Sequence, residues 1–327
     1  MARIIDIRER DAQEAAIGEL RAGRCIAIPT ETVYGLAADA CNGVGVATIF
    51  AMKGRPRFNP LICHVDGLAM AETIGVFDPV SRKLANHFWP GPLTLVVSRR
   101  KDSGVHDLVT ADLDTVAIRA PASPSRAVIA AFGKPLAAPS ANRSGRISPT
   151  QAQHVGDEYR DEPLLVLDAG PARVGLESTI VKVEDGHIVL LRPGGISKEE
   201  IEALCGIPVI EPRAYSGIVA PGMLESHYAP EAGMVLDIRD CPQGAALLAF
   251  GSADGKDRSR ASSIRNLSQT GDLTEAAANL YSMMKELDAE HPALIAVETI
   301  PGAGLASAIN DRLKRAAAPR PDKDETR

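Results

Sequence analysis

Hydrophobic residues alternate along the chain between short continuous apolar runs and longer segments with helical spacing, which is the pattern of an α/β protein. Residues 11–22 place Ala15, Ala16 and Leu20 on one helical face, with Asp11 in position to cap the first turn. Strands are expected at 25–28, 61–65, 93–97, 115–121, 164–168, 176–183 and 188–192. Helices are expected at 44–53, 81–88 and 125–132, and two more should begin at residue 149 and at Ser197. Glu200 lies three residues after Ser197, which is the spacing of a capping box.

Residues 211–231 interrupt this pattern, because turn formers occur throughout and no period is sustained. The segment nevertheless contains Tyr215, Met223, His227 and Tyr228, which a passive spacer would not need. We therefore predict a linker that packs into a site.

A second, smaller α/β pattern follows, with strands at 234–238, 246–250 and 293–299 and helices at 273–287 and 305–316. We expect it to form a small three-layer domain. The predicted organisation is a first domain at 1–210, the linker at 211–231, a small domain at 232–318 and a disordered polar tail at 319–327.

The amino-acid composition argues against some classes of function, in particular nucleic-acid binding through a basic face or through stacked aromatic residues. The chain has 327 residues, a net charge of -6 and only 4% aromatic residues, so neither a basic duplex-binding face nor a base-stacking platform is indicated. Any anion site must be a local cluster. Five scattered cysteines without C-x-x-C spacing suggest free thiols in a reducing cytoplasm, and we expect no signal peptide, no zinc site and no membrane span.

The segment M-K-G-R-P-R-F-N-P-L, residues 52–61, is the first candidate for chemistry. Lys53 and Arg55, followed by Arg57, lie on a backbone broken by glycine and proline, where a compact ammonium and a planar guanidinium suit a triphosphate. A solvated basic turn is the alternative.

A second polar segment follows the short apolar run at 135–139. Hydroxyl, amide and guanidinium groups without carboxylates are typical of an oxyanion-binding loop, although a flexible polar loop would look the same. The residues concerned are Ser140, Asn142, Arg143, Ser144, Arg146 and Ser148.

Individual polar residues in apolar strands are also informative. Arg119 lies in an apolar run and requires an anionic partner, either a carboxylate of the protein or a ligand. A polar cluster at 30–34 comes where a strand ends, a common place for ligand groups, although a capping turn is equally compatible. A lone strand histidine such as His64 is more often structural than a ligand.

The usual nucleotide-binding and hydrolase motifs are absent: there is no G-x-x-x-x-G-K-[ST], G-x-G-x-x-G, H-E-x-x-H or G-x-S-x-G. The remaining polar groups at strand ends include four cations that would neutralise a triphosphate if they converge on one cleft. These groups are Thr32, Lys53, Arg55, Arg119, Ser140, Asn142, Ser178 and Arg192.

Seven ordered motifs resemble the YrdC-like family, and one motif in the linker and one near the C-terminal end resemble its long form, which carries an extra C-terminal domain. The first seven are P-T-E-T-V-Y-G-L (29–36), K-G-R-P-x-x-N-P-L (53–61), W-P-G-P-L-T (89–94), A-I-R-A-P (117–121), A-P-S-A-N-x-S-G (138–145), E-S-T-I-V (177–181) and L-R-P-G (191–194), and the long form adds S-H-Y-A-P (226–230) and A-I-N-D-R-L-x-R-A (308–316).

The resemblance implies a twisted YrdC-like α/β sheet domain with a deep basic cleft, plus a smaller Rossmann-like α/β domain. It also implies a reaction in which L-threonine, bicarbonate or CO2 and ATP, with Mg2+, give threonylcarbamoyl-adenylate and pyrophosphate. A separate transferase then uses this product to modify tRNA.

The family pattern also implies residue roles. Lys53 and Arg55 would bind the triphosphate and serve catalysis, while the metal ligands stay open. The nucleotide site would be completed by Asn59, Thr115 through its backbone, Ser140, Asn142, Ser148, Arg192 and Tyr228 as a lid, and threonine would be held by Thr32, His64, Arg119, the Ala138 backbone and Ser178.

Two other functions remain open from the sequence. One is a module that binds double-stranded RNA or tRNA in the same basic concavity, and the other is a maturation protein that makes a carbamoyl-adenylate for another acceptor. The acidic total argues against the first, and the second domain and linker argue against the other.

Overall fold

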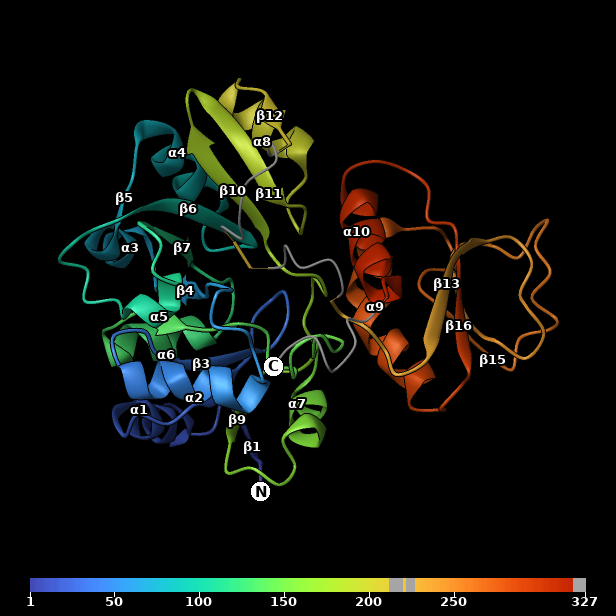
Figure 1. The fold of residues 1–327 in the computed structure, drawn as a ribbon, viewed down its shortest axis with the longest axis horizontal. Coiled ribbons are helices and arrows are strands. Elements are labelled where there is room, and N and C mark those ends of the chain that lie inside the picture. The colour runs from blue at the N-terminus through green and yellow to red at the C-terminus, as the bar shows by residue number, and fades with distance from the viewer. Residues whose placement is uncertain (212–219, 222–226, 320–327) are drawn as a thin grey trace.

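The computed structural model describes residues 1–211, 220–221 and 227–319, which form two sheets with their helices (Figure 1). The larger part is a mixed, twisted sheet of twelve strands, in which eleven follow the order β1-β9-β2-β3-β8-β4-β7-β6-β10-β11-β12 and β5 pairs with β6. Its strands are β1 (Arg3–Asp6), β2 (Ile26–Ile28), β3 (Gly35–Asp39), β4 (Ile62–His64), β5 (Gly75–Val76), β6 (Leu93–Arg99), β7 (Thr115–Arg119), β8 (Leu136–Ala137), β9 (Leu165–Asp168), β10 (Thr179–Glu184), β11 (His187–Arg192) and β12 (Val209–Ile210).

Helices cover both faces of the large sheet. They are α1 (Ala12–Arg21), α2 (Gly43–Lys53), α3 (Leu68–Ile74), α4 (Pro79–Phe88), α5 (Asp107–Thr110), α6 (Ser125–Phe132), α7 (Ala152–Glu158) and α8 (Lys198–Cys205).

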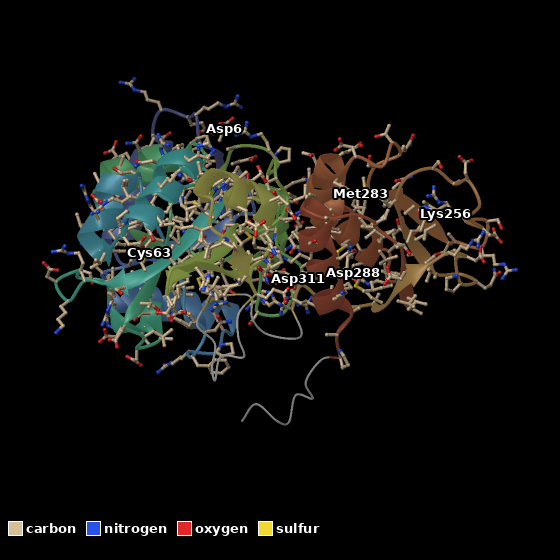
Figure 2. All side chains as sticks on the ribbon, turned by 90° about the horizontal axis from the view of Figure 1, so that it is seen from above. Asp6, Cys63, Lys256, Met283, Asp288 and Asp311 are labelled. Atoms are coloured by element: carbon tan, nitrogen blue, oxygen red, sulfur yellow. The ribbon has the colours of Figure 1, made fainter. Side chains whose placement is uncertain are left out.

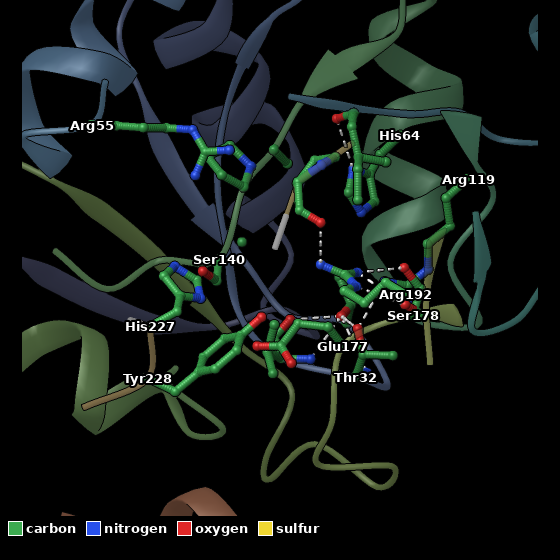
Figure 3. Close-up of a pocket in the computed structure, with 17 residues that line it drawn as sticks. Thr32, Arg55, His64, Arg119, Ser140, Glu177, Ser178, Arg192, His227 and Tyr228 are labelled. Carbon is green, nitrogen blue, oxygen red and sulfur yellow. Dashed lines mark hydrogen bonds between the residues drawn. The ribbon is translucent and has the colours of Figure 1, made fainter. Parts of the chain in front are cut away.

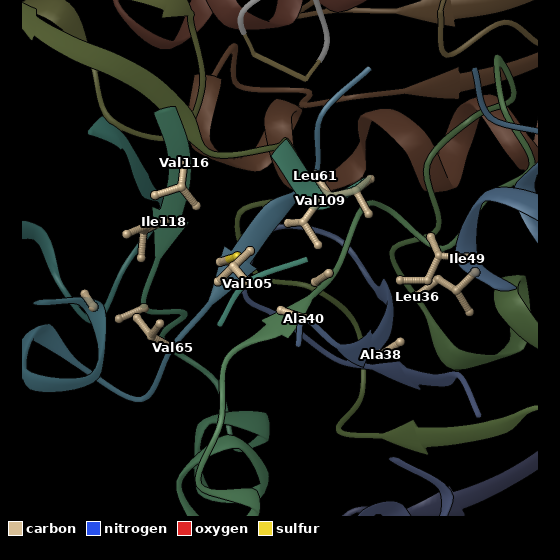
Figure 4. Close-up of a cluster of buried hydrophobic side chains, with 14 of the residues drawn as sticks. Leu36, Ala38, Ala40, Ile49, Leu61, Val65, Val105, Val109, Val116 and Ile118 are labelled. Atoms are coloured by element: carbon tan, nitrogen blue, oxygen red, sulfur yellow. The ribbon is translucent and has the colours of Figure 1, made fainter. Parts of the chain in front are cut away.

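Alternation along the strands divides the core of this part in two. In β2, Ile26 and Ile28 pack with α1 and α6, while Ala27 points to the opposite cluster. That larger cluster joins strands β3, β4 and β7 to α2 and α5, and Figure 4 shows Leu36, Ile49 and Val109 among its members. Burial on both faces explains why these strands read as continuous apolar runs.

Most expected elements of this part are present. Helix α6 covers the predicted residues 125–132, and the capping box is formed because the Ser197 hydroxyl accepts from the Glu200 amide. The predicted Asp11 cap is wrong: Asp11 occupies the N-cap position of α1, but its αR backbone leaves the side chain without a capping hydrogen bond.

The smaller part is a parallel sheet in the order β13-β16-β14-β15. Its elements are β13 (Gly233–Ile238), β14 (Ala246–Ala249), β15 (Ser263–Asn266), α9 (Leu273–Asp288), β16 (Leu294–Glu298) and α10 (Leu305–Ala317). Strand β15 was not predicted, because its residues S-I-R-N carry no sustained apolar signal.

The expected three-layer arrangement is wrong for the described residues of this part. Both helices pack on one face of the sheet, against Leu248 and Val297, whereas Leu247 and Ala296 on the other face are covered by loop residues such as Cys241 and Ala261. That this smaller part is a Rossmann-like domain stays a prediction.

Helices α9 and α10 lie between the two sheets (Figure 1), so the small part meets the large part through its helical layer. Figure 2 shows Asp311 of α10 near this junction and Cys63 well inside the large part. Within the described ranges, no helix combines the length and the apolar character that crossing a bilayer requires.

Candidate functional site

Strand ends of the large sheet converge on a small pocket of about 50 Å³ (Figure 3). Nine of the predicted site residues line it. These are Thr32, His64, Arg119, Ala138 and Ser178 of the expected threonine set and Arg55, Ser140, Arg192 and Tyr228 of the expected nucleotide set.

Sheet register accounts for one end of this pocket. Strands β4 and β7 are parallel, and their register pairs His64 with Arg119. Arg119 Nη1 donates to the Thr32 hydroxyl at 2.7 Å, and Arg119 Nη2 lies 2.8 Å from Glu31 Oε2. Burial, and then the charge of Arg119, lower the pKa of His64 to about 3, so this imidazole is neutral at pH 7.

The Arg119 and Glu31 contact is an ion pair without hydrogen-bond alignment. Both side chains are only 4% exposed, yet among the described residues neither Arg119 Nη2 nor either Glu31 carboxylate oxygen has a hydrogen-bond partner. Glu31 is thus the protein anion that Arg119 requires, and Arg119 still has an unused donor.

Three other cations are buried and bound by neutral oxygens. Lys53 Nζ donates to the Ser140 carbonyl at 2.6 Å and to the Asn142 carbonyl, and Arg55 donates to the Asn59 and Pro60 carbonyls at 3.2 and 2.9 Å. Arg192 donates to the Ser178 carbonyl at 2.9 Å and to its hydroxyl at 3.1 Å. In the described part of the chain, none of these three cations forms an ion pair.

The electrostatics agree with that arrangement. Burial, and then the nearby charge of Arg55, lower the pKa of Lys53 well below its ordinary value, and burial lowers the pKa of Arg55 to about 10. Burial also lowers the pKa of Arg192. Desolvated positive charge without an ion-pair partner among the described residues favours an anionic ligand.

The other five expected nucleotide residues do not line the pocket. Lys53 is the last residue of α2, where the predicted helix 44–53 ends, and the side-chain oxygens of Asn59 and Asn142 are buried without hydrogen-bond partners among the described residues. Ser148 donates to Glu177 at 2.7 Å. Thr115 begins β7, four residues and therefore about 13 Å from Arg119 along the strand.

Two arginines of the expected oxyanion loop are engaged elsewhere. Arg143 pairs with Glu162 at 2.6 Å and Arg146 pairs with Glu231 at 2.8 Å, both on the surface. Neither guanidinium lines the pocket, and oxyanion binding by these two residues stays a prediction.

Two titratable pocket residues received no ligand or catalytic role from the sequence, although both lie inside motifs. Glu177 precedes Ser178 and lines the pocket, and His227, buried beside Tyr228, lines it as well. A carboxylate next to a predicted ligand residue was the available signal for Glu177. Tyr215 and Met223 of the predicted linker lie outside the described residues.

Tyr228 lies within the predicted linker and is buried. Its ring lies 4.0 Å from that of His227 and 5.6 Å from that of Tyr281, between centroids, and Ala229 N donates to the Gly145 carbonyl at 2.8 Å. The chain entering the small part is therefore fastened over the pocket. The described residues include no group of three His, Cys, Asp or Glu side chains that could hold a metal ion.

Comparisons with known proteins agree with this fold. Residues 19–194 match the family model described as "Telomere recombination", which covers Sua5, YciO and YrdC proteins, and residues 196–318 match "Threonylcarbamoyl-AMP synthase, C-terminal domain". The chain is 37% identical to a threonylcarbamoyl-AMP synthase of Pyrococcus abyssi, over 97% of this chain and 98% of the relative.

Two further comparisons support the match. A threonylcarbamoyl-AMP synthase of Bacillus subtilis is 38% identical over 94% of this chain and 93% of its own. The crystal structure of P. abyssi Sua5 complexed with L-threonine superposes with a TM-score of 0.87 at 34% identity, covering 97% of each chain. With its fold, both family models and near-full-length relatives in agreement, the chain belongs to the Sua5/YciO/YrdC family, in the form that carries the threonylcarbamoyl-AMP synthase C-terminal domain.

Proposed function

We propose that this protein is a threonylcarbamoyl-AMP synthase, which converts L-threonine, bicarbonate or CO2 and ATP into threonylcarbamoyl-adenylate and pyrophosphate. The observation that carries the proposal is the set of three buried cations, Lys53, Arg55 and Arg192, held by neutral oxygens beside a pocket whose far end presents Arg119. Near-full-length relatives named for this activity give the same reaction.

The two ends of the pocket suit the two substrates. The unused Nη2 donor of Arg119 suits the carboxylate of threonine, with Thr32, His64, Ser178 and the Ala138 backbone around it. Lys53, Arg55 and Arg192 suit the phosphates of ATP, with Asn59, Ser140, Asn142 and Ser148 nearby and Thr115 contributing from farther away.

The proposed chemistry proceeds in two steps. The threonine amine attacks CO2, a C–N bond forms, and a proton is released to give the carbamate. A carbamate oxygen then attacks the α-phosphorus, and the P–O bond to pyrophosphate breaks. Glu177 is unsuited as a general base, because its oxygens already accept hydrogen bonds from Ser148, Tyr281 and Arg312.

Magnesium is proposed to arrive with ATP. Mg2+ usually binds substrate phosphates and water and needs few protein carboxylates, which fits a pocket whose described residues offer no three-ligand cluster. Bound there, it offsets the charge of the leaving pyrophosphate.

The described side chains enclose only about 50 Å³, whereas pockets for ligands of this size measure about 300 Å³ or more. We propose that Tyr228, as part of a lid that includes the 211–231 linker, moves to admit ATP. The deep basic cleft and the domain limits at 210 and 232 belong to this proposal.

The test is pyrophosphate release from ATP, bicarbonate and magnesium with threonine, serine or no amino acid. We expect threonine-dependent release that falls at least 100-fold in Lys53→Ala. The matched control is Arg57→Ala, which removes an exposed cation two residues after Arg55 and should retain near-normal release. Release that does not depend on the amino acid would contradict the proposal.

Passage of the product to a tRNA threonylcarbamoyl transferase, direct contact with tRNA and a cytoplasmic location are parts of the same proposal. The five free cysteines support the cytoplasmic location.

A gel shift with tRNA at rising salt separates the enzyme from a pure RNA-binding module, because binding driven by phosphates weakens steeply with salt. Amino-acid-independent adenylate formation would instead favour a carbamoyl-adenylate site for another acceptor.

A further inference from the structure

Glu177 is the point at which the C-terminal helices reach the pocket. Its Oε2 accepts from Arg312 Nε of α10 at 2.8 Å and from the Tyr281 hydroxyl of α9 at 2.9 Å, while its Oε1 accepts from Ser148 at 2.7 Å. Arg312 is fully buried and Glu177 is 7% exposed by side chain, so this is an interior contact between the two parts.

The same two C-terminal residues also hold Tyr228. The Arg312 guanidinium lies 5.4 Å from the centre of the Tyr228 ring, and the Tyr281 ring lies 5.6 Å from it. Tyr228 has a positive φ of 64°, which is uncommon outside glycine, so its buried position depends on these neighbours. Arg312 Nη2 further donates to the Pro193 carbonyl at 2.9 Å, one residue after Arg192.

The negative charge of Glu177 affects which ligands the pocket can bind. Glu177 lies in a pocket that we propose binds a triphosphate, so an uncompensated carboxylate there would repel the ligand. Burial would raise the pKa of Glu177, but the charges of Arg312 and Arg192 and hydrogen bonds from Arg312 and Ser148 lower it to about 2. The carboxylate is therefore ionised at neutral pH, and Arg312 supplies its nearest compensating charge.

We infer that Arg312 and Tyr281 are positioning residues of the nucleotide site, supplied by the C-terminal part and acting through the Glu177 carboxylate. They neutralise and orient Glu177, which in turn fixes the Ser148 hydroxyl, and they hold Tyr228 over the pocket. This inference rests on the proposed function, because it concerns the binding of ATP. It assigns the C-terminal part a direct contribution to the site.

The experiment measures kcat, KM for ATP and KM for threonine by pyrophosphate release, together with the Kd for ATP and magnesium by calorimetry. Tyr281→Phe removes the hydrogen bond to Glu177 and keeps the ring against Tyr228. Arg312→Lys keeps the positive charge but loses the planar guanidinium group with its several donors. Ser282→Ala is the control, because it removes the 3.2 Å hydrogen bond from Gln151 across the same junction without touching Glu177. Thermal unfolding verifies that each variant is folded.

We expect the Kd and KM for ATP to rise at least fivefold in Arg312→Lys and about threefold in Tyr281→Phe, with the KM for threonine changed less than twofold. In a Glu177→Gln background the effect of Tyr281→Phe, which keeps its ring against Tyr228, should shrink to less than twofold, and the effect of Arg312→Lys should also shrink, because the carboxylate through which they act is gone. Ser282→Ala should match the wild type.

The inference would be overturned by folded Arg312→Lys and Tyr281→Phe proteins that match Ser282→Ala, or by effects undiminished in the Glu177→Gln background. Failure of the proposed function is recognised separately. In that case the wild type itself would show no threonine-dependent release and no ATP binding, whatever the variants do.

Discussion

At the scale of single residues, the main feature of the site is buried charge. Arg119 and Glu31 lie within 2.8 Å of each other at 4% side-chain exposure, but without hydrogen-bond alignment. Breaking a buried pair by removing one charge is costly because the other charge is left uncompensated. Arg119 therefore depends on Glu31 for its counter-charge in the free protein.

We predict that Glu31→Gln lowers the free energy of unfolding by about 3 kcal/mol, because Arg119 loses its counter-charge. If the threonine carboxylate binds Arg119, saturating threonine should raise the melting temperature of this variant more than that of the wild type. Thermal shift assays with and without threonine measure both effects.

The control is Glu72→Gln, which breaks the exposed pair with Arg82 and should cost no more than about 1 kcal/mol. An equal or smaller threonine shift in Glu31→Gln than in the wild type would count against Arg119 as the carboxylate site.

At the scale of elements, the turn after β11 fixes the residues that precede β10. A Cβ at Gly194 would lie 2.4 Å from the Glu177 carbonyl oxygen and 2.4 Å from the Thr179 nitrogen. Only a residue without a side chain allows the backbones to approach this closely. Gly194 thereby sets the position of Glu177 and Ser178, two pocket residues that lie far from it in sequence.

We predict that Gly194→Ala destabilises the protein by about 2–3 kcal/mol through overpacking and reduces pyrophosphate release at least tenfold, because residues 177–179 must move. Gly18→Ala is the matched control: Gly18 is exposed within α1, and an added Cβ meets nothing within 4 Å. It should raise stability by up to about 1 kcal/mol and leave release unchanged. Melting curves and the release assay decide between these outcomes, and a Gly194→Ala protein as active as Gly18→Ala would refute the prediction.

At the scale of the whole molecule, two buried histidines make stability depend on pH. Burial lowers the pKa of both His64 and His227 to about 3, so they are neutral in the folded protein at pH values where the unfolded chain binds protons. The unfolded state thus holds more protons between about pH 3 and 6.5, and stability falls as the pH falls through this range.

We predict a melting temperature that decreases from pH 7 to pH 5, with each of these histidines contributing up to about 1.4 kcal/mol per pH unit below 6.5. The decrease should be smaller in His64→Asn, which cannot bind the extra proton. Melting curves at pH 5, 6 and 7 measure both slopes, and parallel slopes would show that His64 does not contribute.

Local patterns predicted much of this protein. Apolar runs and helical spacing located α6 and most strands, and the capping box at Ser197 formed as expected, because these features depend on residues close in sequence. The family motifs identified nine residues that now line one pocket. Residue types and their spacing sufficed for both results.

Only the tertiary structure decided which partner each charged group meets. Three contacts show this: the ion pair of Arg143 with Glu162, the hydrogen bond from Ser148 to Glu177, and the hydrogen bond from Arg312 to Glu177, which joins residues 135 positions apart. No local periodicity in the sequence encodes such contacts. Strand β15 was missed for the same reason, since pairing with β14 rather than its own composition makes it a strand. The sequence by itself determined most of the elements, the family and the kinds of chemical group at the site, and the fold determined which of those groups are compensated and which remain available to a ligand.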